Sequence, residues 1–504
     1  MQEAGIARLL FSRRKVSCPG DLWEKYDMKK TLILLFFLFF NIWVLPASAE
    51  TITVSPDGLS LTEALAQCSD GDVIELSDGV YAEPEEVFPV TVTKTVTICP
   101  ADGAHPVIDA PAFQAAIRVE AAGVNLQGLD IRMRRTGIYA IGDDMTLTDC
   151  RISLADEEWR TSSCGMWCGG IYRMKVLNCT FEGCGISLAG PPLSERSREL
   201  PVLTGLFEVG EDEAYFTSHT IENCTVNGKP LFYAVSQDTV NVPEDAGEVI
   251  CCGCKEVIVK NADVSDGSMG MVLTYNDSVT IENCKADRCG VFGIYVAKCE
   301  GGTLRACSTE GTNHGLDIRA CRNFALIDCE AKDCDQGLFF SHVEDSVMTG
   351  CTVSGTGQGY FMAGGSRNAL WNCVALDCEN GYNLQKENDV AMTGCIAEGC
   401  TVCGIRLDWT PTVLSGNQVR KNWVGVMCYG DVAFEILDNT FEDNEACGLY
   451  LRDIAGSRFI GNTITGSGVD SAEALGTMNG SLWTANTLDV PMTAEEGIDF
   501  NYVE

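Results

Sequence analysis

The fold is decided by a stretch of sequence that repeats itself every 22 residues. Residues 348–369 read MTGCTVSGTGQGYFMAGGSRNA, and residues 370–391 read LWNCVALDCENGYNLQKENDVA. Each copy opens with an apolar residue and has cysteine at its fourth position. This cysteine column spans several repeats and then continues as asparagine, through Cys284, Cys307, Cys329, Cys351, Cys373, Cys395, Asn417, Asn439 and Asn462. A fixed period of this length indicates structural rungs stacked into a solenoid.

Each repeat divides into three short segments separated by bends. The residue before the column is nearly always Gly, Asn or Asp, the residues that tolerate a left-handed backbone. The residue three positions before the column is apolar throughout, and the residue two positions after it is mostly apolar. A third segment opens with Gly and alternates apolar with variable residues, as in 293–296 and 337–340. We therefore predict an all-β, single-stranded parallel β-helix, with three parallel sheets and rungs about 4.8 Å apart.

The beginning of the chain has the features of an export signal. Residues 28–49 contain two lysines, an apolar run and a final Ala-Ser-Ala, which together are typical of a signal peptide. The apolar run is short for a membrane anchor. Residues 1–27 are interpreted as an upstream mis-start, with Met28 as the true first residue. We expect a protein that is secreted, either extracellular or associated with the cell surface.

The remaining residues divide into four parts. Residues 50–115 are predicted to form an N-terminal cap and the first rungs, with a short helix where Ser60–Glu63 make a capping-box pattern. Residues 116–468 are predicted to form the parallel β-helix, with a loop insertion at 189–216. Residues 469–504 lose the repeat and are expected to form a C-terminal cap or tail.

The net charge limits the kinds of partner. A formal charge of −36 argues against nucleic acid, because phosphate binding needs clustered Lys and Arg. It suits a soluble extracellular surface. After residue 49 there is no second apolar segment, so we expect no membrane span in the mature chain. The sequence leaves the oligomeric state open.

The chain is rich in cysteine, with 27 residues of this type. In an exported protein they would ordinarily suggest disulfides. In-register column residues would have Cβ atoms about 4.8 Å apart, whereas a disulfide needs about 3.8 Å. We therefore predict mainly reduced core thiols, with disulfides at turns and metal binding as alternatives. Soft Cu(I) would suit the thiols of Cys251, Cys252 and Cys254, although their strand-like run favours packing.

The bend, column and Gly-strand pattern resembles the right-handed parallel β-helix repeats of the pectin-lyase-like superfamily. Together with the module formed by Asn227–Tyr233 and Val242–Ile250, it is more narrowly similar to NosD-like proteins, secreted and of the methanogen type. The resemblance covers roughly 220–465. It implies the fold, but it does not fix an activity, because this architecture hosts lyases, hydrolases, epimerases and non-enzymes. In the NosD family the implied role is assisting copper-site maturation of a nitrous oxide reductase.

The Gly-opening strand offers a candidate binding face. Its residues two and four positions after Gly are predicted to point outward. Aromatic rings with planar hydrogen-bonding groups suit a sugar, although aromatic residues also simply favour strands. The candidate carbohydrate-binding residues are Tyr295, Asp317, Arg319, Phe339, Phe361, Asn383, Gln385, Arg406, Asp408, Tyr450 and Arg452.

Catalysis has weaker support. His314, Asp317 and Arg319 form a local group with a base, an acid and a cation, which would suit a Ca²⁺-assisted lyase. His314 is favoured as a solvated turn residue. Asp317 and Asp408 lie four rungs apart, roughly 19 Å, which is too far for the carboxylate pair of a glycosidase.

The sequence as a whole favours non-catalytic binding of extracellular or cell-envelope carbohydrate. The first alternative is a polysaccharide lyase or epimerase acting on acidic glycans. The second is a NosD-like copper-handling accessory protein. No cofactor is predicted, and Ca²⁺ and Cu(I) belong only to these alternatives.

Overall fold

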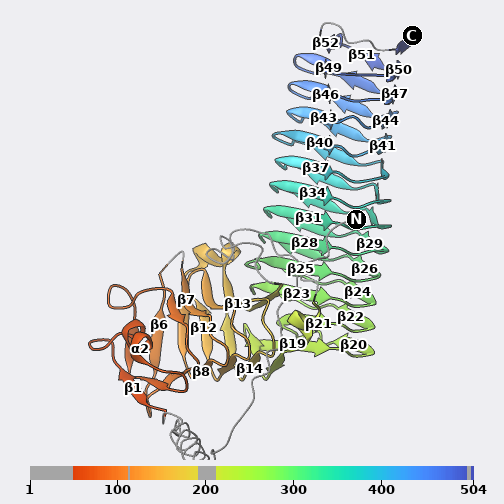
Figure 1. The fold of residues 1–504 in the computed structure, drawn as a ribbon. Coiled ribbons are helices and arrows are strands. Elements are labelled where there is room, and N and C mark those ends of the chain that lie inside the picture. The colour runs from red at the N-terminus through yellow and green to blue at the C-terminus, as the bar shows by residue number, and fades with distance from the viewer. Residues whose placement is uncertain (1–48, 112–113, 191–211, 496–500, 504) are drawn as a thin grey trace, which may run out of the picture. The chain divides into compact units, whose positions relative to one another are not determined.

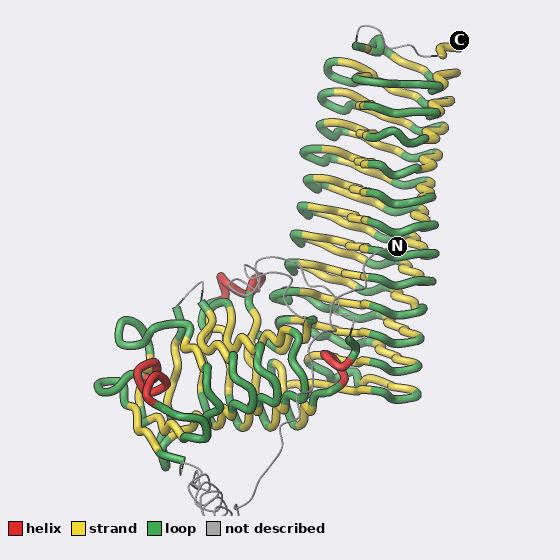
Figure 2. The backbone as a smooth tube through the Cα atoms, viewed as in Figure 1, coloured by secondary structure: helices red, strands yellow, loops and turns green. Residues whose placement is uncertain are grey.

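A computed structural model describes residues 49–111, 114–190, 212–495 and 501–503. The predicted signal peptide, the segment before it and most of the 189–216 insertion lie outside these residues. The described chain is an all-β parallel β-helix, as predicted, and successive rungs stack on one another within each of two sections (Figures 1 and 2). No helix among the described residues is long and apolar enough to cross a membrane.

The first half of the solenoid, which we call the N-terminal section (residues 50–226), has three parallel sheets. Sheet A consists of β1 (Thr51–Val54), β2 (Val73–Leu76), β5 (Thr97–Pro100), β8 (Asn125–Gln127), β11 (Thr146–Thr148), β14 (Lys175–Leu177) and β17 (Thr220–Glu222). Sheet B consists of β3 (Gly79–Tyr81), β6 (Pro106–Asp109), β9 (Asp130–Met133), β12 (Arg151–Leu154), β15 (Thr180–Glu182) and β18 (Thr225–Val226). Sheet C consists of β4 (Val90–Val92), β7 (Ala115–Val119), β10 (Thr136–Ala140), β13 (Cys164–Gly169) and β16 (Ile186–Ala189).

The C-terminal section (residues 229–503) has three further parallel sheets. Sheet D consists of β19 (Lys229–Val235), β21 (Glu248–Cys252), β23 (Met269–Thr274), β25 (Phe292–Ala297), β28 (His314–Arg319), β31 (Gln336–Ser341), β34 (Gln358–Ala363), β37 (Asn380–Gln385), β40 (Cys403–Asp408), β43 (Val424–Tyr429), β46 (Cys447–Arg452), β49 (Asp470–Leu475) and β52 (Thr493–Ala494). Sheet E consists of β20 (Thr239–Val242), β22 (Glu256–Lys260), β24 (Ser278–Glu282), β26 (Gly302–Arg305), β29 (Phe324–Ile327), β32 (Val347–Thr349), β35 (Ala369–Trp371), β38 (Val390–Thr393), β41 (Thr412–Ser415), β44 (Phe434–Leu437), β47 (Arg458–Ile460), β50 (Leu482–Thr484) and β53 (Asn501–Val503). Sheet F consists of β27 (Ser308–Glu310), β30 (Glu330–Lys332), β33 (Thr352–Ser354), β36 (Val374–Leu376), β39 (Ile396–Glu398), β42 (Gln418–Arg420), β45 (Thr440–Glu442), β48 (Thr463–Thr465) and β51 (Thr487–Leu488).

A tight hairpin joins the two sections. β18 pairs with β19 in antiparallel register, with Val226 opposite Lys229. The two residues between them, Asn227 and Gly228, have φ angles of 52° and 76°. An Asn-Gly pair with two positive φ angles is the preferred two-residue hairpin turn. The chain therefore reverses here before the regular 22-residue rungs begin.

Among the described residues, three short helical segments accompany the strands. The predicted capping helix is α2 (Leu61–Gln67), and Ser60 and Glu63 form the reciprocal capping box. Its buried residues belong to the apolar core of the N-terminal section. The others are a 3-10 turn, η1 (Glu157–Ser162), and α4 (Ala214–Thr217).

The predicted bends and the Gly-opening strands follow from backbone geometry. The bend residues Asn283 and Asn372 have φ angles of 54° and 52°, in the left-handed region that Asn tolerates. The glycines of sheet D are required for a different reason. A Cβ on Gly359 would lie 2.3 Å from the carbonyl oxygen of Gly381 in the next rung. Adjacent rungs therefore approach too closely for any side chain at this column.

Candidate functional site

The outer face of sheet D carries the predicted binding residues in register. Leu316 and Ile318 of β28 belong to the core. Asp317 and Arg319 alternate with them along the strand and therefore face outward. The column two positions after Gly is Tyr295, Asp317, Phe339, Phe361, Asn383, Arg406, Met427 and Tyr450. The column four positions after Gly is Ala297, Arg319, Ser341, Ala363, Gln385, Asp408, Tyr429 and Arg452.

A third outward column escaped the sequence analysis. The strand pairing passes from Phe292 opposite His314 to Ile294 opposite Leu316, and it skips the glycine between them. The residue before Gly therefore lies on the same face as the residue two after Gly. This column is Phe292, His314, Gln336, Gln358, Asn380, Cys403, Val424 and Cys447. The frequent polar residues at this position were the feature of the sequence that could have indicated an outward-facing column.

His314, Asp317 and Arg319 meet on this face. Arg319 Nε and Nη2 donate to the two carboxylate oxygens of Asp317 at 2.6 and 2.7 Å. His314 Nδ1 lies 2.9 Å from Asp317 Oδ2. Asp317 has no exposed surface and His314 is 7% exposed. The expectation that His314 is a solvated turn residue is therefore wrong, because it lies within β28 and contacts Asp317.

Aromatic rings enclose this cluster. The Arg319 guanidinium lies 5.5 Å from the ring centroid of Phe292, 5.7 Å from that of Tyr295 and 4.9 Å from that of Phe339. Burial works to raise the pKa of Asp317, but Arg319 and His314 hold it below the usual value. Burial also raises the pKa of Tyr295. The cluster is a buried, charge-compensated network, so Asp317 lacks the access to substrate that a catalytic acid or base needs.

The outer face differs from the predicted one at its first rungs. Tyr295 is 3% exposed and belongs with Phe292 to the apolar cluster of the N-terminal section. Both rings line a small cavity with Leu188 of β16 and Phe216 of α4. Tyr295, Asp317 and Arg319 thus point outward but are covered. The exposed part of the face begins at β31.

From β31 onward the face is partly exposed. The rings of Phe339 and Phe361 stack with centroids 4.8 Å apart and an interplanar angle of 9°. Asn383 Nδ2 donates to Gln358 Oε1 at 2.8 Å, and Gln385 Nε2 donates to Asn383 Oδ1 at 3.1 Å. Stacked rings therefore lie beside a connected row of amides.

The end of the face around β40–β46 holds the largest exposed rings. Arg406 Nε donates to Asp408 Oδ2 at 2.9 Å, and its guanidinium lies 5.6 Å from the centroid of the Tyr429 ring. The rings of Tyr429 and Tyr450 are 5.6 Å apart. Two tryptophans that the sequence analysis did not select flank this region. Trp409 directly follows β40 and Trp423 directly precedes β43, and they are 55% and 52% exposed.

Two models of known protein families match parts of this β-helix. Residues 207–369 match the model described as "Right handed beta helix region", and residues 343–489 match "Periplasmic copper-binding protein (NosD)". The chain is a NosD-like right-handed parallel β-helix repeat protein. A search of curated proteins gave no significant match to this NosD-like chain.

Solved structures resemble the NosD-like chain in fold. A mutant of the periplasmic alginate epimerase AlgG is 11% identical, with 85% of each chain covered and a TM-score of 0.33. The alginate lyase from Paenibacillus sp. str. FPU-7 is 13% identical, with 64% of this chain and 97% of that chain covered and a TM-score of 0.29. The Azotobacter vinelandii mannuronan C-5 epimerase AlgE4 A-module is 13% identical, with 86% and 91% covered and a TM-score of 0.30.

The thiols of the NosD-like chain do not converge into a copper site in the described structure. Cys251 belongs to the core of the C-terminal section, whereas Cys252 belongs to the cluster of the N-terminal section, because successive strand residues face opposite sides. Cys254 lies in the same core as Cys251. Among the described residues no group of three or more His, Cys, Asp or Glu is placed to hold a metal. No copper-dependent chemistry is therefore assigned to these thiols.

The repeated cysteines are core residues. Every described cysteine is a free thiol, and all but Cys99 are buried. In the column, Cys373 Sγ lies 3.6 Å from the carbonyl oxygen of Trp371, and Cys395 Sγ lies 3.5 Å from that of Leu370. These thiols fill the interior and make weak hydrogen bonds to the backbone.

Proposed function

We propose that this protein is a non-catalytic carbohydrate-binding protein that works outside the cytoplasm. The observation that carries the proposal is a set of aromatic residues on sheet D around β40–β46. The exposed Trp409 and Trp423 lie at opposite ends of its strands, and the half-buried Tyr429 and Tyr450 lie on its outer face. We call these four residues the distal aromatic patch. The predicted signal peptide supports an exported location, as does the match to a family described as periplasmic.

The chemistry of the distal aromatic patch suits a sugar. Sugar rings have apolar faces that pack on aromatic side chains, and their hydroxyl rims need hydrogen-bonding partners. The ion-paired Arg406 and Asp408 lie among the rings. The side chains of Arg406 and Asp408 are 39% and 18% exposed. The patch thus offers stacking surfaces and polar groups side by side.

The rigidity and the charge of the patch limit the kind of glycan that can bind. Tyr429 and Tyr450 lie on the paired strands β43 and β46, which hold side chains about 4.8 Å apart, so these two rings lose little conformational entropy on binding. Arg406 is neutralised by Asp408, and the chain has a formal charge of −36. A polyanionic glycan would be repelled at long range. We therefore propose a neutral, hydroxyl-rich glycan of the extracellular matrix or cell envelope.

A glycan array followed by calorimetric titration tests this proposal. We expect Trp423→Ala to weaken binding of the best neutral glycan at least 10-fold, because it removes an exposed stacking ring. Trp371→Ala is the matched control, since Trp371 is 49% exposed but lies on β35 of sheet E. Absence of neutral glycan binding, or equal loss in both variants, would overturn the proposal.

The two alternative functions, polysaccharide lyase or epimerase and copper handling, would give different experimental results. A lyase or epimerase would use the cluster of His314, Asp317 and Arg319, and incubation with acidic polysaccharides would then give unsaturated ends or altered uronates. The burial of Asp317 argues against this activity. Copper handling, suggested by the NosD match, requires metal in anaerobically purified protein. Copper at background level would remove this second alternative.

A further inference from the structure

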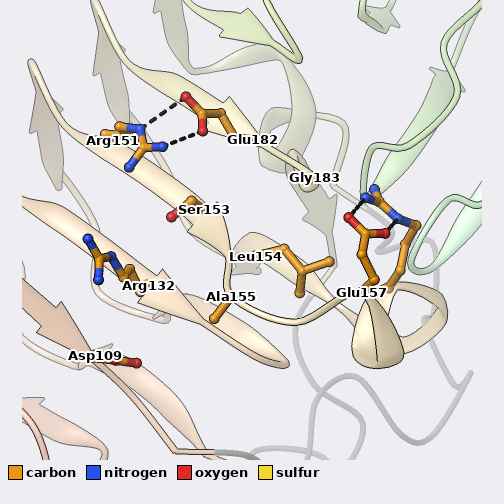
Figure 3. Close-up of a pocket in the computed structure, with 10 residues that line it drawn as sticks. Asp109, Arg132, Arg151, Ser153, Leu154, Ala155, Glu157, Glu182 and Gly183 are labelled. Carbon is orange, nitrogen blue, oxygen red and sulfur yellow. Dashed lines mark hydrogen bonds and ion pairs between the residues drawn. The ribbon is translucent and has the colours of Figure 1, made fainter.

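A polar pocket of about 520 Å³ lies in the N-terminal section, before the residues matched by either family model (Figure 3). Its floor is the outer face of sheet B. One column of paired residues crosses this floor from β6 to β15, in the order Asp109, Arg132, Ser153 and Glu182. The rest of the lining comes from the neighbouring strands and from η1, and consists of Arg151, Leu154, Ala155, Glu157, Arg160 and Gly183. The pocket is therefore separate from the outer face of sheet D.

Each acidic residue of the pocket contacts an arginine, and each of these arginines also contacts a second carboxylate outside the pocket lining. Asp109 Oδ1 accepts from Arg134 Nη1 at 2.9 Å. Glu182 Oε1 accepts from Arg151 Nε at 3.0 Å. Glu157 Oε2 accepts from Arg160 Nε at 2.7 Å. Figure 3 shows the Arg151–Glu182 and Glu157–Arg160 pairs as dashed lines.

Arg132 is left over from this pairing. It is exposed and lies in register between Asp109 and Ser153. Within the described part of the chain its side chain makes no hydrogen bond or ion pair, and no dashed line reaches it in Figure 3. Of the three arginines that line the pocket, Arg132 is therefore the one whose guanidinium has no partner among the described residues.

We propose that this pocket binds a sugar acid, with the ligand carboxylate on Arg132. A guanidinium presents two parallel N–H donors that match a carboxylate. The Ser153 hydroxyl and the oxygens of the paired acids can bond to sugar hydroxyls. A multiply charged phosphate is disfavoured, because the carboxylates of Asp109 and Glu182 lie in the same column as Arg132. The pocket volume lies in the range of small-molecule sites.

Calorimetric titration of the mature protein with glucuronate tests this assignment, with glucose and inorganic phosphate as comparison ligands. We expect glucuronate to bind more tightly than either, and Arg132→Gln to weaken it at least 10-fold. The matched control is Arg458→Gln, because Arg458 is an exposed arginine on β47 of sheet E. Circular dichroism should show the same fold for both variants.

The outcomes separate this site from the distal aromatic patch. Trp423→Ala should leave glucuronate binding unchanged, and Arg132→Gln should leave neutral glycan binding unchanged. Loss of glucuronate binding in Arg132→Gln alone supports the proposal. It is overturned if glucuronate fails to bind, if phosphate binds equally well, or if Arg132→Gln and Arg458→Gln behave alike.

Discussion

Asp317 lies at an outward position of β28, as the alternation of the strand predicts, but its side chain is buried. It is a carboxylate without exposed surface, kept ionised by Arg319 and His314. Removing one partner of a buried ion pair leaves an uncompensated charge, which typically costs 3–5 kcal/mol. We therefore expect Arg319→Met to lower the free energy of unfolding at pH 7 by about 3–5 kcal/mol, measured by urea denaturation.

The loss of stability in Arg319→Met should become smaller as pH falls. The pKa of Asp317 is lowered in the folded protein, so its stabilising contribution is present above the unfolded pKa of about 3.9 and is lost as pH falls below it. In Arg319→Met the carboxyl stays buried without its arginine, so it can relieve the uncompensated charge by binding a proton as pH falls. The penalty of Arg319→Met should therefore shrink between pH 7 and pH 4. The double variant Asp317→Asn, Arg319→Met should recover most of the loss at pH 7. A double variant as unstable as Arg319→Met would contradict this account.

Residue-level alternation predicted which side chains of sheet D point outward, but it could not predict which are exposed. Tyr295 and Phe292 are covered by Leu188 and Phe216, which lie far earlier in the chain. A 22-residue period contains no information about such contacts. The exposure of Trp409 and Trp423 was missed for a related reason, since both occupy turns just outside the strand positions that the period selects.

Among the elements, the interior column changes its chemistry from thiol to amide. Asn439 Nδ2 donates to the carbonyl oxygen of Leu414 at 3.0 Å, and its Oδ1 accepts from the backbone N–H of Asn417 at 2.9 Å. Cys373 makes only a weak contact with the carbonyl oxygen of Trp371. We expect Asn439→Ala to cost about 3 kcal/mol, because it leaves buried groups without partners, and Cys373→Ala about 1 kcal/mol.

Chemical denaturation of the two variants provides the comparison, because both positions are buried in the same column. Equal losses would show that the asparagines act only by filling space. The sequence predicted these strands and their common column from period and bend residues. It did not predict the irregular pairing at Gly293, because skipping one residue leaves the 22-residue spacing intact.

At the scale of the whole molecule, the two sections are held together by buried polar contacts as well as by the hairpin at Asn227. The Glu248 side chain of β21 accepts from the backbone N–H of Ile186 in β16, at 3.2 and 3.1 Å. Ser268 Oγ accepts from the N–H of Gly165 and of Gly185, at 3.1 and 2.7 Å. These contacts lie outside the repeat, so the sequence predicted the rungs but not this junction.

Glu248 makes the junction sensitive to pH. Burial raises the pKa of this fully buried carboxyl well above its ordinary value, and Ile186 offsets only part of that effect. The folded protein therefore holds a proton that the unfolded chain loses above pH 4.5 or so. Its free energy of unfolding should then fall as pH rises, by at most about 1.4 kcal/mol per pH unit.

Replacing Glu248 by Gln removes the titration and keeps an oxygen that can accept from Ile186. We expect Glu248→Gln to gain stability relative to the unmodified protein as pH rises from 5 to 7, measured by urea denaturation at each pH. Glu442→Gln is the matched control for lost negative charge, because Glu442 is exposed on β45. If both variants follow the same pH profile, the buried carboxyl at the junction is not the group that titrates, and the general charge of the chain sets the pH dependence.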